Sequence, residues 1–551
     1  MTVRAGRRAG SSLAAMTMLL ALALSACSSS TGQATASTRA SGGQALTSTS
    51  CHPPPSSGSV VATPVAGTPS DWNITSFDGT TIRAHWFPVG VAEGKTAPTV
   101  LMGPGWSLSG DTDTQGAGVV GGLAIKDLWA AGYNVLTWDP RGFGKSGGSA
   151  EVDSANFEGR DVSALISWVA TRPGVQLDAV GDPRMGMVGG SYGGGIQLVT
   201  AAIDCRVDAI VPTIAWHSLV TSLDKADTVK SGWSGILSSL SANDHVDPLV
   251  FQAQHTGAST GMITEAQRAW FADRGPAAQV ADIKVPTLIV QGTVDTLFTL
   301  QEGVTNYEIL KQRGIPTSML WFCGGHGVCL TPAGDQQLPG TATIAWLDRY
   351  VRRAPVDTGP GFRFIDQNGT GYSAPNYPLP VGVPITAHGH GTLPMVASGG
   401  SGPVDASGNA QLLAPLVGPI TPARATNAVD VAVSVRDRSA VVVGAPQLRL
   451  TYHGTTPSGP RPTRVFAQLV DETTGLVLGN QITPIAVTLD GRSHTTTVPL
   501  EIVAFTATPS SRLELQLVAT TVAYGQPQLG GSVDFTRIHL ALPVASGIAA
   551  K

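Results

Sequence analysis

The chain has 551 residues, of which 13% are charged, 42% are hydrophobic and 66 are glycine. The charged share lies well below the ~25% of an ordinary domain, and a formal net charge of −4 gives no indication of nucleic acid binding. The length exceeds that of one ordinary domain. Together these features predict a β-rich, loop-rich, extracytoplasmic protein with more than one domain and no nucleic acid partner.

The N-terminal segment has the pattern of an export signal. Basic residues precede an apolar stretch at 13–24, which is too short to span a membrane stably and suits a signal peptide. Leu24-Ser25-Ala26-Cys27 resembles the cleavage box of bacterial lipoproteins, which implies that Cys27 becomes the first mature residue and is acylated. We therefore expect a signal peptide at 1–26 and a protein anchored by lipid on the extracytoplasmic side of the cell membrane. A plain secretory signal with an incidental cysteine is the alternative.

Residues 27–59 are rich in Ser, Thr, Gly and Pro and predict a flexible tether. After it, strand-like and helix-like stretches alternate with short links, which is typical of a mostly parallel sheet flanked by helices. Strands are expected at 74–77, 81–87, 99–102, 134–138, 185–188, 209–214, 285–291 and 318–322, and helices near 121–131, 302–313 and 341–352.

Gly189-Gly190-Ser191-Tyr192-Gly193 stands between an expected strand and a stretch of helical character. In that position a Gly-x-Ser-x-Gly sequence predicts a tight turn that exposes a serine hydroxyl as a nucleophile. The backbone N–H of Tyr192, at the start of the helix, is placed to bind an oxyanion.

A serine nucleophile needs a base and an orienting carboxylate. Asp295 follows the expected strand at 285–291, and His326 follows the strand at 318–322. The order Ser191, Asp295, His326 is that of the α/β-hydrolases, and each residue lies just past a strand, where open α/β sheets place their sites.

A second oxyanion donor is expected in the loop after the strand at 99–102. Gly103-Pro104-Gly105-Trp106 occupies that loop. The backbone N–H of Trp106, or that of Gly105, is the candidate, since glycine allows the main chain to approach a substrate closely.

The cysteines other than Cys27 predict disulfides, because an even number in an exported chain usually pairs. Cys323 and Cys329 flank His326 in one loop and are the easiest pair to close, which leaves Cys51 with Cys205. Zinc binding by the two cysteines and His326 is the alternative. Glycines around His326 suggest a loose loop that a disulfide would confine.

The remaining sequence predicts two further parts. Residues 218–281 contain short amphipathic pieces and predict a helical cap inserted into a catalytic domain at 60–354. Beyond residue 355, Thr- and Val-rich runs alternate with Gly, Pro and Ser turns, which favours a β-sandwich at 355–551. Strands are expected there at 440–452, 464–469, 495–503, 512–518 and 533–542.

Two other features have weaker functional interpretations. His217 either lines the pocket or packs in the core, and His388 with His390 suggests a metal site without supporting carboxylates or cysteines. The glycines at 189–195 suggest a dinucleotide-binding oxidoreductase as a further alternative, but their spacing is not Gly-x-Gly-x-x-Gly. No metal or other cofactor is expected.

The chain resembles the X-prolyl dipeptidyl-peptidase and cocaine-esterase-like group of α/β-hydrolases. The specific marks are Asp139-x-Arg141-Gly142-x-Gly144-x-Ser146-x-Gly148 and Gly189-x-Ser191-Tyr192-x-Gly194-x-x-Gln197. The resemblance implies an α/β-hydrolase domain with a helical cap, followed by a jelly-roll-like β-sandwich. It also implies Ser191 as nucleophile, Asp295 as acid and His326 as base.

One departure from that group concerns the oxyanion hole. Its members commonly place a tyrosine hydroxyl there from a Pro-Tyr sequence, whereas Gly105 and Trp106 follow Pro104 here. Backbone N–H groups or the Trp106 indole would have to replace that hydroxyl.

The sequence therefore predicts a serine hydrolase that cleaves an ester, an amide or an Xaa-Pro peptide bond in a small molecule or peptide. An X-prolyl dipeptidyl-peptidase proper and a catalytically silent binding lipoprotein on the same fold are the alternatives. The sequence does not indicate the substrate or the oligomeric state.

Overall fold

The computed structural model describes residues 65–90, 94–116, 118, 123–435, 439–457, 459–525 and 528–550. The predicted signal peptide, the whole predicted tether, Cys27 and Cys51 lie outside these residues, so the lipid anchor and the Cys51–Cys205 pairing stay predictions. Among the described residues, no helix is long and apolar enough to cross a membrane.

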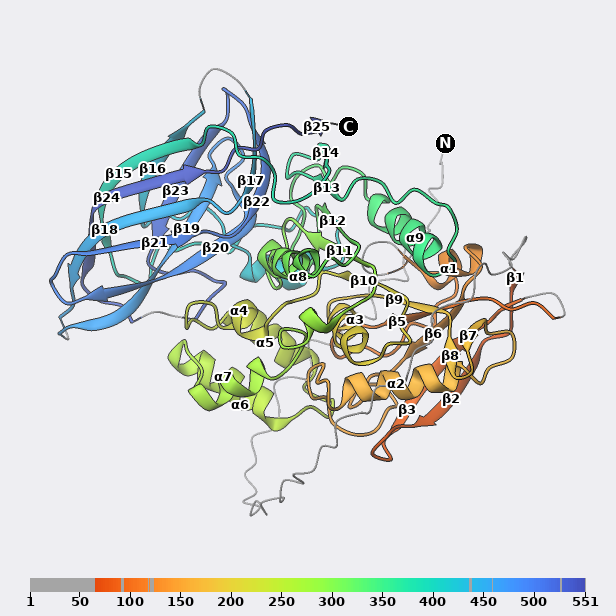
Figure 1. The fold of residues 1–551 in the computed structure, drawn as a ribbon. Helices are drawn as coiled ribbons and strands as arrows, with labels where there is room; N and C mark the ends of the chain where they lie inside the picture. Colours follow the sequence, from red (N-terminus) through yellow and green to blue (C-terminus); the bar gives the residue numbers. More distant parts are fainter. Residues whose placement is uncertain are drawn as a thin grey trace, which may run out of the picture. The chain divides into compact units, whose positions relative to one another are not determined.

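The centre of the catalytic domain is an 11-stranded sheet in the order β2-β3-β6-β5-β9-β10-β11-β12-β13-β14-β25 (Figure 1). The strands from β6 to β13 in this order are parallel. The bounds are β2 (Ser70–Thr75), β3 (Thr81–Phe87), β5 (Thr99–Gly103), β6 (Asn134–Trp138), β9 (Met185–Gly190), β10 (Ala209–Thr213), β11 (Thr287–Gly292), β12 (Thr317–Phe322), β13 (Phe362–Ile365), β14 (Gly371–Ala374) and β25 (Ala549–Ala550). The α/β fold class predicted from sequence is confirmed.

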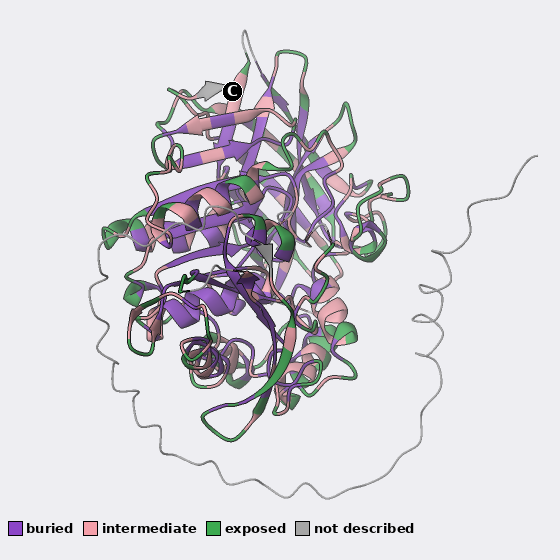
Figure 2. Ribbon diagram, turned by 90° about the vertical axis from the view of Figure 1, so that its right-hand side faces the viewer, coloured by how far each residue is buried: buried purple, intermediate pink, exposed green. Residues whose placement is uncertain are grey.

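Helices cover both faces of this sheet, and Figure 2 shows that its strands are largely buried. The apolar side chains of α1 (Ile125–Ala130) and α9 (Leu338–Tyr350) pack in one core cluster. Those of α2 (Glu158–Val169), α3 (Tyr192–Ile203) and α8 (Leu300–Gln312) pack in another. Strands buried from two sides explain the continuous apolar runs in the sequence.

The segment predicted as a cap contains four helices before the short η1 (Val280–Asp282). They are α4 (Leu219–Leu223), α5 (Ser231–Leu240), α6 (Pro248–Thr260) and α7 (Glu265–Ala272). The sequence at the start of α6 explains its position, because the Asp247 side chain accepts from Leu249 N–H and Pro248 stands at the first turn. Gly261, in the left-handed region, ends the helix.

The C-terminal part is a β-sandwich of antiparallel sheets, with apolar side chains of both four-stranded sheets in one core. One sheet contains β15 (Ile385–Pro394), β24 (Ser532–Leu542), β18 (Gln447–Thr455) and β21 (His494–Pro499), and the other contains β16 (Ala428–Ser434), β23 (Arg512–Val518), β19 (Arg461–Asp471) and β20 (Leu476–Leu489). β17 (Ala440–Gly444) and β22 (Val503–Ala507) form a separate pair.

The structure differs from the sequence prediction at the domain boundary. β13 and β14 lie beyond residue 355, yet they extend the catalytic sheet, since β13 pairs with β12 in parallel. Phe362 of β13 is fully buried and packs edge-on against Trp321 of β12, with the two ring centroids 4.8 Å apart. Strands that the sequence analysis assigns to the sandwich therefore extend one edge of the catalytic sheet.

Candidate active site

Ser191 lies in the turn between β9 and α3, with φ 59° and ψ −119°. This backbone strain is usual at a nucleophile and holds the hydroxyl above the strand ends. The neighbouring glycines allow close packing, because a Cβ on Gly193 would lie 2.1 Å from the carbonyl oxygen of Gly103 at the end of β5. The glycine-rich sequence therefore serves the packing of the turn against β5.

The structure brings together the three residues that the sequence proposes as a triad. His326 Nε2 lies 2.8 Å from Ser191 Oγ, and His326 Nδ1 lies 2.8 Å from Asp295 Oδ2. Asp295 is fully buried, and its Oδ1 accepts from the backbone N–H groups of Leu297 and Phe298 at 3.0 and 2.8 Å. A carboxylate held in this way fixes the ring so that Nδ1 is protonated and Nε2 can accept the serine proton.

The loop of His326 packs directly on the loop of Asp295. A Cβ on Gly325 would lie 2.6 Å from Asp295 Oδ2, and one on Gly327 would lie 1.7 Å from the carbonyl oxygen of Val294. These glycines therefore have a packing role, and the expectation that they make the loop loose stays a prediction. Gly325 is required because the Asp295 side chain fills the space of a Cβ, and Gly327 because the backbone of Val294 lies too close for any side chain.

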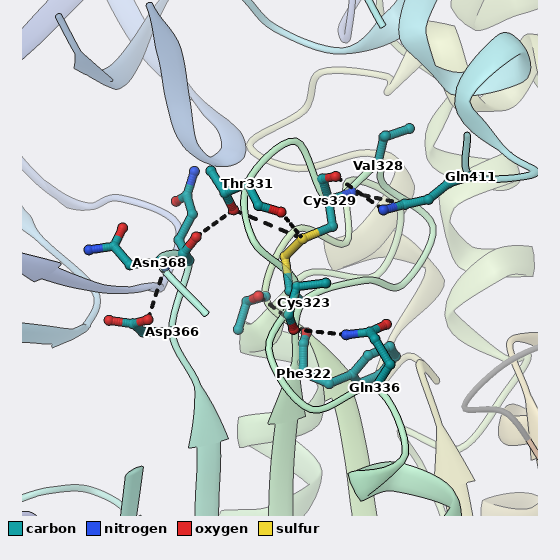
Figure 3. Close-up of a disulfide and its surroundings, with 12 residues drawn as sticks. Phe322, Cys323, Val328, Cys329, Thr331, Gln336, Asp366, Asn368 and Gln411 are labelled. Atoms are coloured by element: carbon teal, nitrogen blue, oxygen red, sulfur yellow. Dashed lines mark hydrogen bonds between the residues drawn. A yellow bond between two sulfur atoms is a disulfide. The ribbon is translucent and has the colours of Figure 1, made fainter. Parts of the chain in front are cut away.

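A disulfide joins Cys323 and Cys329, whose Cα atoms are 5.6 Å apart (Figure 3). The backbone N–H of Cys329 donates to Gln411 Oε1 at 3.0 Å, and its carbonyl oxygen accepts from Gln411 Nε2 and from Asn409 Nδ2. The loop is thus held from both ends. Because both cysteine sulfurs are bonded, the zinc alternative is wrong.

The sequence did not predict that the β-sandwich contacts both catalytic loops. Gln481 Nε2 donates to the carbonyl oxygen of Asp295 at 2.7 Å, and Asn480 Nδ2 donates to that of Val328 at 2.9 Å. The β19–β20 register passes from Gln468↔Ile482 to Val470↔Val477, so residues 478–481 bulge out of β20. This bulge presents both amides to the catalytic domain.

The proposed oxyanion donors lie beside Ser191. Tyr192 is the first residue of α3, so its N–H has no partner within the helix. The Trp106 indole donates to the carbonyl oxygen of Leu237 in α5 at 3.1 Å, and its ring packs edge-on against Phe143 and Tyr192. The indole is therefore engaged with the cap, and the backbone N–H of Trp106 stays the predicted second donor.

Behind Tyr192 lies a group of buried acids that the sequence did not single out. The Tyr192 hydroxyl donates to Glu158 Oε1 at 3.3 Å and accepts from the backbone N–H of Asp153 at 3.3 Å. Burial raises the pKa of Glu158 to about 7, and burial with the nearby Glu158 charge raises the pKa of Asp153 well above its usual range. These carboxyl groups are therefore kept neutral more readily than exposed ones.

The residues of the Asp139–Gly148 sequence have structural contacts. Arg141 Nε and Nη2 donate to the two carboxylate oxygens of Asp161 at 2.6 and 2.7 Å, while Asp139 accepts from the N–H groups of Gly110 and Lys145. This motif therefore folds the loop beneath the site, and none of these contacts involves Ser191.

Two of the histidines singled out by the sequence have contacts with residues outside the triad. His217 Nδ1 lies 2.8 Å from Asn306 Oδ1 of α8, which indicates a packing role. The ring of His388 stacks on that of His539, with the ring centroids 4.7 Å apart. Among the described residues, no group of three or more His, Cys, Asp or Glu side chains is arranged to hold a metal ion.

Residues 78–328 match the family model of the X-Pro dipeptidyl-peptidases (S15 family). This segment of the chain is therefore similar to the S15 hydrolases. The match covers the segment from the first hairpin to the His326 loop, and the resemblance inferred from sequence is confirmed.

Solved structures with this fold cover the S15-type domain and the sandwich together. An α-amino acid ester hydrolase superposes with a TM-score of 0.63 at 14% identity, covering 88% of this chain and 98% of that one. A CocE/NonD family hydrolase from Staphylococcus aureus has a TM-score of 0.60 at 13% identity, covering 86% and 93%. At such low identity these similarities establish the fold alone.

Curated relatives match shorter stretches. Polyketide transferase grgF from Penicillium sp is 28% identical over 143 residues, which is 26% of this chain and 43% of the relative. Dipeptidyl aminopeptidase BIII from Pseudoxanthomonas mexicana is 28% identical over 213 residues, which is 36% of this chain and 27% of the relative. The chain thus spans less than half the length of either relative.

Proposed function

We propose that the protein is a serine hydrolase that cleaves an ester or amide bond through an acyl-enzyme. The hydrogen-bonded series from Ser191 through His326 to Asp295, with both contacts at 2.8 Å, carries this proposal. His326 takes the proton as Ser191 Oγ attacks the carbonyl carbon, and the N–H groups of Tyr192 and Trp106 receive the oxyanion. His326 then protonates the leaving group, and water deacylates Ser191.

The test is covalent labelling. Wild-type protein should react with a fluorophosphonate probe at Ser191, and a Ser191→Ala variant should neither react nor hydrolyse p-nitrophenyl esters. Ser239→Ala, an exposed serine of α5, is the matched control and should label normally. Labelling that persists in Ser191→Ala would place the nucleophile elsewhere, and an unreactive wild type would favour a silent binding protein.

Release of Xaa-Pro dipeptides is the second candidate, and the match of residues 78–328 to the X-Pro dipeptidyl-peptidase family favours it. Gly105 and Trp106 in the loop after β5 favour esters instead, because an amide needs more oxyanion support and one lost donor typically costs ~10²–10³ in rate. Comparing kcat/KM for p-nitrophenyl esters and Xaa-Pro p-nitroanilides decides between them.

We also propose that acylated Cys27 anchors the protein on the extracytoplasmic side of the membrane, which rests on the Leu24-Ser25-Ala26-Cys27 sequence. A Cys27→Ser variant should leave the membrane fraction or accumulate as an unprocessed precursor. Membrane-bound mature protein without acyl chains would contradict the anchor.

A further inference from the structure

Two adjoining apolar cavities lie between Ser191 and the cap. The first, of about 60 Å³, is lined by Ser191 and Tyr192, by aromatic side chains of the catalytic domain and by apolar side chains of the cap. The second, of about 70 Å³, lies within the cap. Both are lined by Leu219, Leu223, Leu237, Val250 and Phe271. The two cavities therefore adjoin at these five apolar side chains, and we refer to the pair of cavities as the apolar path.

The walls of this path contain almost no charge. Trp106, Trp216 and Phe298 line the first cavity, and none of the described residues that line it is charged. Asp224 lines the second cavity, but its carboxylate pairs with Arg268 at 2.7 Å. An α-ammonium group placed in the first cavity would lose its hydration without gaining a charged partner, which is unfavourable. The path therefore disfavours aminoacyl and dipeptidyl groups.

A wider cavity, of about 300 Å³, lies on another side of Ser191. The backbone of Gly103 to Gly105 lines it, together with the polar side chains of Ser109 and Asp111. During an acyl-enzyme reaction the alcohol must leave and water must enter while the acyl group stays on Ser191. The wide, partly polar cavity suits the leaving group and water, and the narrow apolar path suits the retained acyl group.

We propose that the substrate is an ester of an uncharged, apolar, medium-length acyl chain, and that this chain lies beneath the cap along the two cavities. This inference rests on the proposed function. Ser191 Oγ bonds to the ester carbonyl carbon, its proton passes through His326 Nε2 to the departing alkoxide, and the ester C–O bond breaks. Water then adds to the acyl carbon, the Ser191 ester bond breaks, and a fatty acid leaves as the serine proton is restored.

The primary test measures kcat/KM for p-nitrophenyl esters from acetate to dodecanoate. Each buried methylene is worth about fourfold, so kcat/KM should rise at least ~30-fold from acetate to about octanoate. A flat profile, or a preference for acetate, would overturn the inference. So would faster turnover of aminoacyl esters than of octanoate.

Paired variants test the location of the chain. Ser238 lines only the second of the two cavities, whereas Ser239, its neighbour in α5, is exposed and lines neither. Ser238→Phe should lower the ratio of octanoate to butyrate kcat/KM about tenfold, an amount equal to roughly two buried methylenes. Ser239→Phe should keep the wild-type ratio. Equal effects of the two variants would place the acyl chain elsewhere.

Two further arms separate the possible failures. Octyl acetate places the chain on the alcohol side, so a stronger dependence on alcohol length than on acyl length would overturn the assignment of the cavities. If Ser191 reacts with the fluorophosphonate probe but acyl length has no effect, only this inference fails. If Ser191 does not react and no ester is cleaved, the proposed function fails.

Discussion

At the scale of the residue, the site depends on positions where any side chain would be too large. Gly325 has φ +105°, and its missing Cβ leaves room for Asp295 Oδ2. Gly314 has a similar backbone, with φ +76°, but a Cβ there would meet no atom within 4 Å. Alanine substitutions at the two positions therefore distinguish two effects: the cost of a left-handed backbone at a residue with a side chain, and the cost of displacing Asp295.

We predict that Gly325→Ala lowers kcat by about 100-fold, because a shift of ~1 Å in a catalytic group can cost that much. Gly314→Ala should share only the cost of a left-handed alanine, about 1–2 kcal/mol of stability, and should keep its kcat. Steady-state kinetics and thermal unfolding of both variants provide the comparison. Equal kcat values for the two proteins would show that the contact with Asp295 is unimportant.

The sequence could indicate Ser191, Asp295 and His326 because each follows a recognisable strand and local sequence. It could not indicate Gln481, which lies 186 positions from the Asp295 that it contacts. The sequence analysis expects no strand at 476–489, where Gly479 and Asn480, both with positive φ, interrupt the apolar run of β20. The boundary at 355 failed for a related reason, since β13 pairs by tertiary contact with β12.

At the scale of the element, the bulge of β20 makes the β-sandwich part of the active site. Glu501 of the sandwich makes further contacts outside the active site. Its carboxylate pairs with Lys225 of the cap and accepts a hydrogen bond from the Thr299 hydroxyl. Lys230, fully buried, donates to the carbonyl oxygen of Leu297 at 2.9 Å, and burial lowers its pKa to about 8. The sandwich therefore contacts the cap as well as the loop of the catalytic acid.

We predict that Gln481 is a positioning residue. Gln481→Ala and Gln481→Glu both remove the N–H donor to Asp295, so kcat should fall roughly tenfold while KM changes little. Gln468→Ala is the matched control, since Gln468 is a buried amide of the same sandwich that donates to the carbonyl oxygen of Ala423. If Gln468→Ala lowers kcat as much as Gln481→Ala does, general loosening of the sandwich would explain the effect.

At the scale of the whole molecule, titratable groups whose pKa is raised by folding influence the pH dependence of stability. Burial raises the pKa of Glu158 to about 7 and that of Asp224 to about 6. Hydrogen bonding to Asp139 raises the pKa of His85. In each case the folded state binds its proton more tightly than the unfolded chain does. The resulting stabilisation is complete below the unfolded pKa and is lost as the pH rises through the folded pKa.

The protein should therefore unfold at a lower temperature at pH 8 than at pH 5. Each unit of pKa shift corresponds to about 1.4 kcal/mol, so Glu158 should provide much of the slope, and Glu158→Gln should flatten it between pH 5 and 8. Lys230, whose pKa is lowered, acts in the opposite direction and above this window. Scanning calorimetry at constant ionic strength, with the exposed Glu265→Gln as control, measures the effect. An unfolding temperature that rises steadily to pH 8 would mean that Glu158 is ionised in the folded protein and is stabilised by its hydrogen bonds to the N–H groups of Glu151 and Ser154.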